Sequence, residues 1–197
     1  MAPQRRFRYP HPFHGINGTA RMLFHSTTLQ DAKRIELEKR GDERGFFART
    51  FCEREFAAQG LETQFVQQNA SRSAQQGTLR GMHFQKGADA EVKLIRCLSG
   101  AILDVIVDLR PESPTYKKWE AFELSDANSD MLYVPRGFAH GFITLTDNVE
   151  VTYLVSAFYA PAAEGGVRWN DPVIAIAWPF EPTVLSPKDA AWPDFEG

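Results

Sequence analysis

The sequence has few of the features that hold small secreted domains together. It contains only two cysteines in 197 residues, Cys52 and Cys97. Two cysteines are too few for a disulfide framework, and they lack the CxxC or CxxH spacing of structural zinc sites. We therefore predict that both are reduced packing residues. A chain of this length can bury a core without disulfide or metal support.

Long apolar runs and an excess of positive charge are also missing. No stretch reaches the roughly 18 apolar residues of a membrane span, and the N-terminus lacks the hydrophobic region of a signal peptide. The formal net charge of -3 and the pI near 6.0 argue against a nucleic-acid-binding or membrane-surface role, because both need a basic field. These absences predict a cytoplasmic protein whose partners are small molecules or other proteins.

Helix signals are scarce as well. One short helix is expected over residues 53–59, closed by Gly60. Elsewhere, short β-favouring runs are separated by Gly, Pro, Asp and Ser, a spacing typical of an antiparallel sandwich or barrel. The sequence predicts one all-β domain over residues 26–197, after an N-terminal extension, residues 1–25, without periodicity. The expected strands cover residues 45–51, 63–69, 78–85, 92–98, 101–109, 118–124, 131–135, 138–146 and 149–159.

Several expected strands carry a polar side chain in an apolar setting. Each has an ordinary structural explanation, because a single buried histidine is usually a hydrogen-bonded core residue and a single lysine is usually solvated. In a small barrel, however, inward polar residues from different strands must converge or stay unsatisfied. Together they indicate a polar pocket. The residues are Gln67, Asn69, Arg80, His83, Lys93, Asp104, His140 and Tyr153.

Two segments fit the motifs of the cupin fold. VPRGFAHGF (134–142) contains the PxGxxH pattern of the second cupin motif, and GTLRGMHFQ (77–85) followed by KLIRCLSG (93–100) fits the frame of the first. The resemblance implies a cupin-type jelly roll, which is an antiparallel β-sandwich, with a few short helices.

The metal ligands of this frame are incomplete. Metal-binding cupins supply three histidines and a glutamate, whereas here only His83 and His140 stand at ligand positions, with Gln85 and Lys93 in place of the others. A lysine ammonium repels a cation, and two imidazoles are a poor ligand set. We predict a pocket without metal or cofactor; a metal-dependent cupin oxygenase or isomerase is the alternative.

A metal-free pocket with histidine, lysine and tyrosine suits proton transfer next to a carbonyl. Histidine, with an ordinary pKa of about 6.5, can act as a base at neutral pH. A lysine ammonium can stabilise the oxyanion that forms when the α-proton leaves. A tyrosine on the opposite side can return a proton to the other face, so that a stereocentre is inverted without a cofactor.

An ordered set of motifs over about residues 28–190 resembles the dTDP-4-dehydrorhamnose 3,5-epimerase family. Each motif alone is weakly specific, but the ordered set is specific. The motifs are DERGFF (42–47), QQNASRS (67–73), GTLRGMHFQ (77–85), KLIRCLSGAILDVIVDLRPESPTY (93–116), VPRGFAHGF (134–142), a TYL and FYAP block (152–161), EGGVRWNDP (164–172) and LSPKD (185–189).

The resemblance implies roles for particular residues. His83 matches the catalytic base, Asp189 the acid paired with it, and Tyr153 the proton donor. Lys93 matches the residue that steadies the enolate oxygen. A second His-Asp pair, His140 and Asp104, falls near the sugar, and Tyr159 falls at an expected aromatic wall. The other residues expected to contact the nucleotide, pyrophosphate or sugar are Arg44, Gln67, Asn69, Arg80, Glu164 and Lys188.

The sequence departs from the family pattern at Arg49, Gln68, Leu154 and Phe158. The proton-transfer residues are retained while part of the binding surface differs, so the expected substrate is less defined than the chemistry. The prediction is a homodimeric, cofactor-independent 3,5-epimerase of a dTDP-linked 4-keto-6-deoxy sugar. The alternatives are an epimerase at carbon 3 only, an epimerase of another nucleotide sugar, and a binding module without activity.

Overall fold

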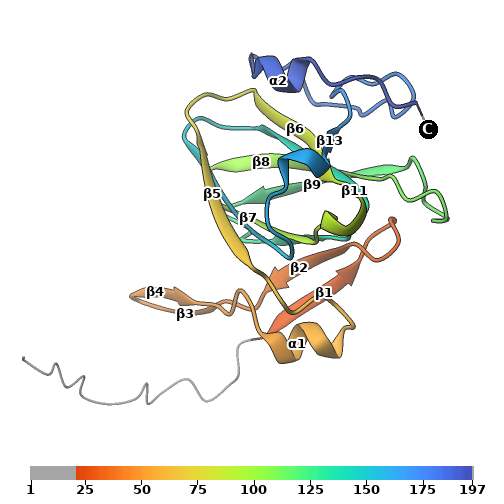
Figure 1. Cartoon of the computed structure of the whole chain (residues 1–197). Coiled ribbons are helices and arrows are strands. Elements are labelled where there is room, and N and C mark those ends of the chain that lie inside the picture. The colour runs from red at the N-terminus through yellow and green to blue at the C-terminus, as the bar shows by residue number, and fades with distance from the viewer. Residues whose placement is uncertain (1–20, 197) are drawn as a thin grey trace, which may run out of the picture.

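The computed structural model describes residues 21–196, which form two β-sheets packed face to face (Figure 1). The first sheet has the strand order β1-β2-β10-β7-β12-β5, and all its pairings are antiparallel. Its strands are β1 (Met22–Ser26), β2 (Lys33–Leu37), β10 (Met131–Val134), β7 (Lys93–Ser99), β12 (Val149–Val155) and β5 (Gln67–Ser73).

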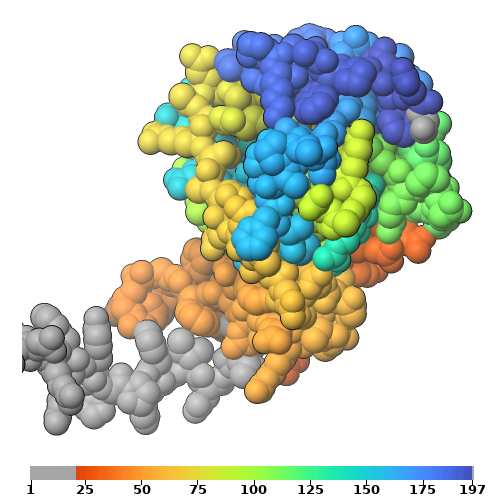
Figure 2. All heavy atoms as spheres, in the orientation of Figure 1, coloured from red at the N-terminus to blue at the C-terminus, as the bar shows by residue number. Residues whose placement is uncertain are grey.

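The second sheet has the order β13-β6-β11-β8-β9, and the short strand β14 pairs in parallel with β6. Its strands are β13 (Glu164–Gly166), β6 (Thr78–Gln85), β11 (Phe138–Thr144), β8 (Ala101–Asp108), β9 (Trp119–Ser125) and β14 (Val184–Leu185). A separate hairpin, β3 (Arg40–Asp42) and β4 (Gly45–Phe47), stands out from the body of the molecule (Figures 1 and 2).

The main core fills the space between the two sheets. On β8, Ile102 and Ile106 point into this core, whereas Val105 and Val107 point to the outer face of the second sheet. This alternation follows from the two-residue period of a strand and agrees with the all-β prediction. Asp104 lies on the inner face and is fully buried, so a carboxylate enters the core from the middle of a strand.

The outer faces of both sheets are partly covered. Helix α1 (Glu53–Ala58) places Phe56 against the first sheet, where Phe56 is fully buried beside Ile35 and Leu94. The C-terminal segment, including helix α2 (Pro187–Ala190), lies against the second sheet (Figure 1) and forms part of the outer surface, in dark blue in Figure 2. Asp189 of α2 lies beside His83 of β6.

Most of the predicted elements are present, and their ends differ. The predicted strand 78–85 is confirmed as β6, and the predicted helix 53–59 is observed as α1, with Gly60 at φ +68°. The predicted run 63–69 lies earlier than the observed strand β5, and the run 149–159 ends earlier, at Val155. Strand β1 begins inside the predicted N-terminal extension; residues 1–20 of that extension lie outside the described residues.

Two glycines allow β6 and β11 to approach closely. Gly81 has φ +144°, and a Cβ atom there would lie 2.5 Å from the Cα of Gly141. The contact adjoins a register shift between His140 and Phe142, and His140 is opposite His83 in the pairing. The glycines thus help to place two histidines from distant parts of the sequence next to each other.

Within residues 21–196, no helix has the length and apolar character needed to cross a membrane.

Candidate active site

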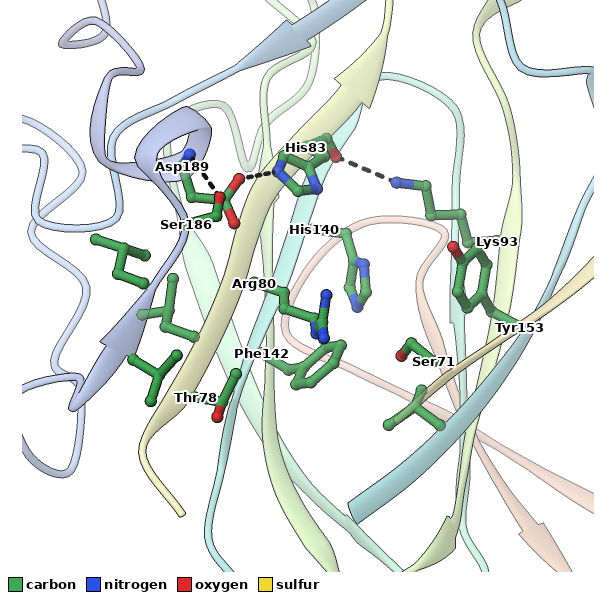
Figure 3. A pocket seen from close by; sticks show the side chains of 14 residues that line it. Ser71, Thr78, Arg80, His83, Lys93, His140, Phe142, Tyr153, Ser186 and Asp189 are labelled. Atoms are coloured by element: carbon green, nitrogen blue, oxygen red, sulfur yellow. Dashed lines mark hydrogen bonds and ion pairs between the residues drawn. The ribbon is translucent and has the colours of Figure 1, made fainter. Parts of the chain in front are cut away.

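A cavity of about 330 Å³ opens between the two sheets. Arg80 and His83 on β6 and His140 on β11 line one wall, while Lys93 on β7 and Tyr153 on β12 line the wall that faces it (Figure 3). Strand β14 and the α2 segment add the remaining side. Five of the predicted polar strand residues therefore meet at one cavity.

His83 pairs with a carboxylate from the C-terminal segment. The Nε2 atom of His83 lies 2.6 Å from Oδ1 of Asp189. In the neutral tautomer that donates Nε2–H to the carboxylate, Nδ1 carries a free lone pair. Figure 3 shows the second ring nitrogen of His83 turned toward the cavity. The arrangement leaves His83 able to accept a proton from a bound molecule.

Asp189 is held in position by its own segment and by β6. It is 5% exposed, and its backbone N–H donates to the hydroxyl of Ser186, which caps α2. Burial alone raises the pKa of Asp189, but hydrogen bonds from His83, Ser186 and the backbone N–H of Gly81 outweigh it and lower the pKa overall. The carboxylate is therefore ionised at neutral pH and orients the imidazole.

A second histidine–aspartate pair lies deeper in the cavity. The Nε2 atom of His140 lies 2.6 Å from Oδ1 of Asp104, and Asp104 is fully buried on β8. Asp104 is predicted from the sequence to need a partner, and His140 on the neighbouring strand β11 is that partner. The pair places a second imidazole in the cavity wall.

The opposite wall supplies a cation and a phenol. The Nζ atom of Lys93 donates to the backbone oxygen of His83 at 3.2 Å and lies 3.2 Å from Oε1 of Glu91. Burial raises the pKa of Tyr153 above its ordinary value, and the charge of Glu91 adds to this while Arg80 opposes it. Tyr153 is therefore protonated at neutral pH and can act as an acid.

Comparisons with known proteins identify the family of this chain. The sequence model described as dTDP-4-dehydrorhamnose 3,5-epimerase matches residues 26–197. The dTDP-4-dehydrorhamnose 3,5-epimerase of Sinorhizobium fredii is 46% identical over 173 residues, which cover 87% of this chain and 89% of that protein. The chain belongs to the dTDP-4-dehydrorhamnose 3,5-epimerase family. It is accordingly an isomerase of the epimerase type with a cupin-like fold.

Two solved structures of epimerases also match. The dTDP-4-dehydrorhamnose 3,5-epimerase of Bacillus anthracis, with TDP and PPi bound, has a TM-score of 0.86 and 45% identity, and the match covers 89% of this chain and 100% of that one. A 3'-monoepimerase from Streptomyces bikiniensis, in complex with dTDP-quinovose, has a TM-score of 0.80 and 35% identity, and the match covers 86% of each chain. The fold is thus shared with a 3,5-epimerase and with a 3'-monoepimerase.

Four of the expected substrate-binding residues form a cluster beside the epimerase cavity rather than in its lining. The phenol of Tyr159 donates to Glu164, whose carboxylate lies 2.6 Å from Nζ of Lys188, and Gln67 accepts from the backbone of Tyr159. Burial raises the pKa of Glu164, but the hydrogen bonds from Lys188 and Tyr159 lower it overall. We call Gln67, Tyr159, Glu164 and Lys188 the rim cluster. Lys188 directly precedes the cavity residue Asp189, so the cluster lies next to the cavity lining.

The three other residues of this predicted substrate-contact set, Arg80, Asn69 and Arg44, lie in three different places. Arg80 lines the cavity and donates to Ser73 and to the backbone oxygen of Arg72. Asn69 is opposite Tyr153 in the β5–β12 pairing, on the face that carries the cavity residue Ser71. Arg44 is not at the cavity of its own chain: it lies at the tip of the β3–β4 hairpin, is highly exposed and pairs with Asp42.

None of the four departures from the family pattern lines the cavity. Arg49 pairs with Glu55 of α1 at 2.6 Å, and Leu154 packs on the outer face of the first sheet. Gln68 donates to Thr152, and Phe158 is largely exposed. The departures therefore lie outside the set of side chains that the sequence predicts for proton transfer.

Sequence reasoning missed several residues of the site. A signal for Ser186 was present, because Ser-Pro-Lys-Asp is a typical helix start with serine at the N-cap. The unpredicted cavity residues are Ser71, Thr78, Leu79, Phe142, Val151, Val184, Leu185 and Ser186. In the described part of the chain, no group of three or more His, Cys, Asp or Glu side chains is placed to hold a metal ion.

Proposed function

We propose that the chain epimerises carbons 3 and 5 of dTDP-4-dehydro-6-deoxyglucose, without a cofactor, to give dTDP-4-dehydrorhamnose. The observation that carries the proposal is the placement of a His-Asp pair and a protonated tyrosine on facing walls of one cavity. Inversion of a carbon requires removal of a proton from one face and delivery to the other. A base and an acid on opposite sides of a bound sugar meet this requirement.

The first step is proton removal beside the 4-keto group. The free nitrogen of His83 takes the proton from the carbon, and the electrons of the C–H bond move to the carbonyl oxygen to form an enolate. Asp189 balances the charge of the resulting imidazolium, since its Oδ1 lies 2.6 Å from Nε2 of His83. The ammonium of Lys93, at the facing wall, stabilises the enolate oxygen.

The second step is proton delivery from the other side. The phenol of Tyr153 donates its proton to the enolate carbon, the carbonyl forms again, and the phenolate recovers a proton from solvent. His83 returns its own proton to solvent, so atoms and charges balance over the cycle. The same sequence at the second carbon completes the proposed reaction.

The proposal for substrate binding rests on the positive charge of Arg80 and on the ligands bound in similar structures. Arg80 presents a guanidinium at the cavity, and a planar guanidinium matches the oxygens of a pyrophosphate. The similar structures hold TDP with PPi and dTDP-quinovose, which supports a dTDP-linked sugar. Asn69, the His140–Asp104 pair and the rim cluster are proposed to contact the sugar and nucleotide, because they surround the cavity.

A homodimer is part of this proposal. The β3–β4 hairpin carries Arg44 away from the cavity of its own chain, and Phe46 and Phe47 beside it are half-exposed. A second subunit that buries these phenylalanines would bring Arg44 to a partner cavity.

We also propose that the protein works in the cytoplasm. The two free cysteines, Cys52 and Cys97, suit that reducing compartment.

Epimerisation at carbon 3 alone is the second candidate, because the 3'-monoepimerase shares the fold at 35% identity. The test is incubation with dTDP-4-keto-6-deoxyglucose in deuterated water, followed by mass and proton NMR analysis. We expect deuterium at carbons 3 and 5. Label at carbon 3 alone would assign the monoepimerase reaction, and label at neither, beside an active control enzyme, would overturn the proposed substrate.

The Asp189→Asn variant is expected to lose most of its turnover. An amide at this position can no longer balance the imidazolium of His83, and it can hold the wrong tautomer of the ring. We expect kcat to fall by roughly 10²-fold or more, measured by the deuterium assay.

A matched control is the Asp130→Asn variant. Asp130 is also buried and pairs with Arg34 at 2.6 Å, but it does not line the cavity. Its turnover should stay near that of the unmodified chain when both proteins are folded. Equal losses in the two variants would contradict a specific role for Asp189.

A further inference from the structure

Glu91 is a mostly buried carboxylate directly behind the cavity wall. Its side chain is 10% exposed, and it belongs to the loop between the 3-10 helix η1 (Gly87–Asp89) and β7. It does not line the cavity, so it is not placed to touch a bound sugar. A buried carboxylate is costly unless it is paired and hydrogen-bonded, and both of its oxygens have partners.

The partners of Glu91 connect it to the site. Oε1 lies 3.2 Å from Nζ of Lys93, and Oε2 accepts a hydrogen bond from the side-chain amide of Gln85. Gln85 is itself fixed, because its amide oxygen accepts from the backbone of Ala160 at 2.6 Å and its NH₂ group donates to the backbone of Asp89 at 3.0 Å. Glu91 is thus anchored on one side and holds the Lys93 ammonium on the other.

The ammonium of Lys93 has only two anchors that the structure records, Glu91 and the backbone oxygen of His83. A lysine side chain has four rotatable bonds, so an ammonium without a charged partner would be held loosely. The Glu91 contact therefore decides where the cation lies in relation to the space between His83 and Tyr153.

The same carboxylate contributes to the electrostatic environment of Tyr153. With Glu91 present, the positive charge of Lys93 is compensated from behind the wall. Without it, the charge of Arg80, which favours the phenolate, would act on the phenol without this opposing negative charge. The ionisable residues that face Tyr153 from the surrounding elements are Arg80 and His83 on β6, Lys93 on β7, His140 on β11 and Asp189 on α2.

We propose that Glu91 is a positioning residue of this site, which fixes the Lys93 ammonium at the cavity wall and supplies a negative charge that favours the acid form of the Tyr153 phenol. The catalytic consequence rests on the proposed function, whereas the electrostatic one does not. Glu91 acts through Lys93 and Tyr153 and has no contact with the reacting carbons.

The test is titration of Tyr153 in the substrate-free protein by the ultraviolet absorbance of tyrosinate. The chain has five tyrosines, so the signal of Tyr153 is the difference between each protein and the same protein carrying Tyr153→Phe. We expect the Glu91→Gln variant to ionise Tyr153 at lower pH than the unmodified chain. Folding of each variant is verified by circular dichroism and thermal unfolding.

Two further variants separate charge from structure. Glu91→Asp keeps the charge on a shorter side chain and should largely retain the Tyr153 titration. If Glu91→Gln does not fold, the Glu91→Asp variant still tests the proposal. Glu62→Gln is the matched control, because Glu62 pairs with Arg136 at 2.8 Å outside the cavity lining. An unchanged Tyr153 titration in folded Glu91→Gln, or an equal shift in Glu62→Gln, would overturn the proposal.

Turnover provides an independent readout. In Glu91→Gln we expect kcat to fall by roughly 3- to 30-fold, because the displaced ammonium stabilises the enolate less well, with little change in KM. The alkaline limb of the kcat profile should move to lower pH together with the Tyr153 titration. If the titration shifts but the unmodified chain exchanges no deuterium, the electrostatic role of Glu91 stands and the proposed function fails.

Discussion

Replacement of His83 by asparagine is expected to lower both turnover and deuterium exchange at carbons 3 and 5 by about 10²- to 10⁴-fold. The asparagine amide keeps hydrogen-bonding capacity toward Asp189, which lies 2.6 Å from the imidazole in the unmodified chain, but it has no basic lone pair. Loss of a general base typically costs about 10²- to 10⁴-fold in rate. Both effects are measured by mass and NMR analysis of the sugar in deuterated water.

The matched control for His83 is His25→Asn. His25 also pairs with a carboxylate, Glu36 at 3.1 Å, but it lies on the edge strand β1 and not at the cavity. This variant should exchange and turn over at nearly the original rate. Near-full turnover in His83→Asn would remove His83 from the proposed mechanism, whatever the control showed.

The Tyr153→Phe variant is expected to separate exchange from inversion. The phenylalanine ring preserves the packing of the β12 wall, and His83 can still remove and return a proton on one face. Deuterium should therefore still enter the substrate, while formation of the epimerised product falls by about 10²- to 10⁴-fold. The measurement compares label in recovered substrate with the amount of product.

The matched control for Tyr153 is Tyr116→Phe, because Tyr116 packs against Phe195 and does not line the cavity. It should form product at nearly the original rate. Product formation by Tyr153→Phe at the control rate would mean that another group delivers the second proton. In the unmodified chain the acid form of Tyr153 is required, so activity should be lost as pH rises through its raised pKa.

Local sequence patterns predicted much of the architecture for a physical reason. Alternation along β8 separates Ile102 and Ile106 from Val105 and Val107, and the strand places them on opposite faces. Strand β2 escaped prediction because Lys33, Arg34 and Glu36 obscure its apolar positions. The predicted run 63–69 differs from β5 at both ends because both faces of β5, with the sequence QQNASRS, are polar and show no apolar alternation.

Residue types and strand patterns identify the side chains that could perform the chemistry. His83, Lys93, His140 and Tyr153 occur within strand motifs, and their chemical types together indicated proton transfer near a carbonyl. Asp189 and Asp104 were identifiable as well, the first through the family motif and the second because a mid-strand carboxylate needs a partner. These conclusions depend on residue type and on the two-residue period, which are properties of the local chain.

The way in which these groups face one another depends on how distant segments pack. The sheet order places β6 and β11 opposite β7 and β12, so His83 and Tyr153 lie on facing walls. It also brings the loop residue Glu91 behind Lys93 and carries Arg44 away from the cavity. Strand pairing and loop packing depend on contacts between distant segments, and a periodic pattern within one segment contains no information about which partner it will meet.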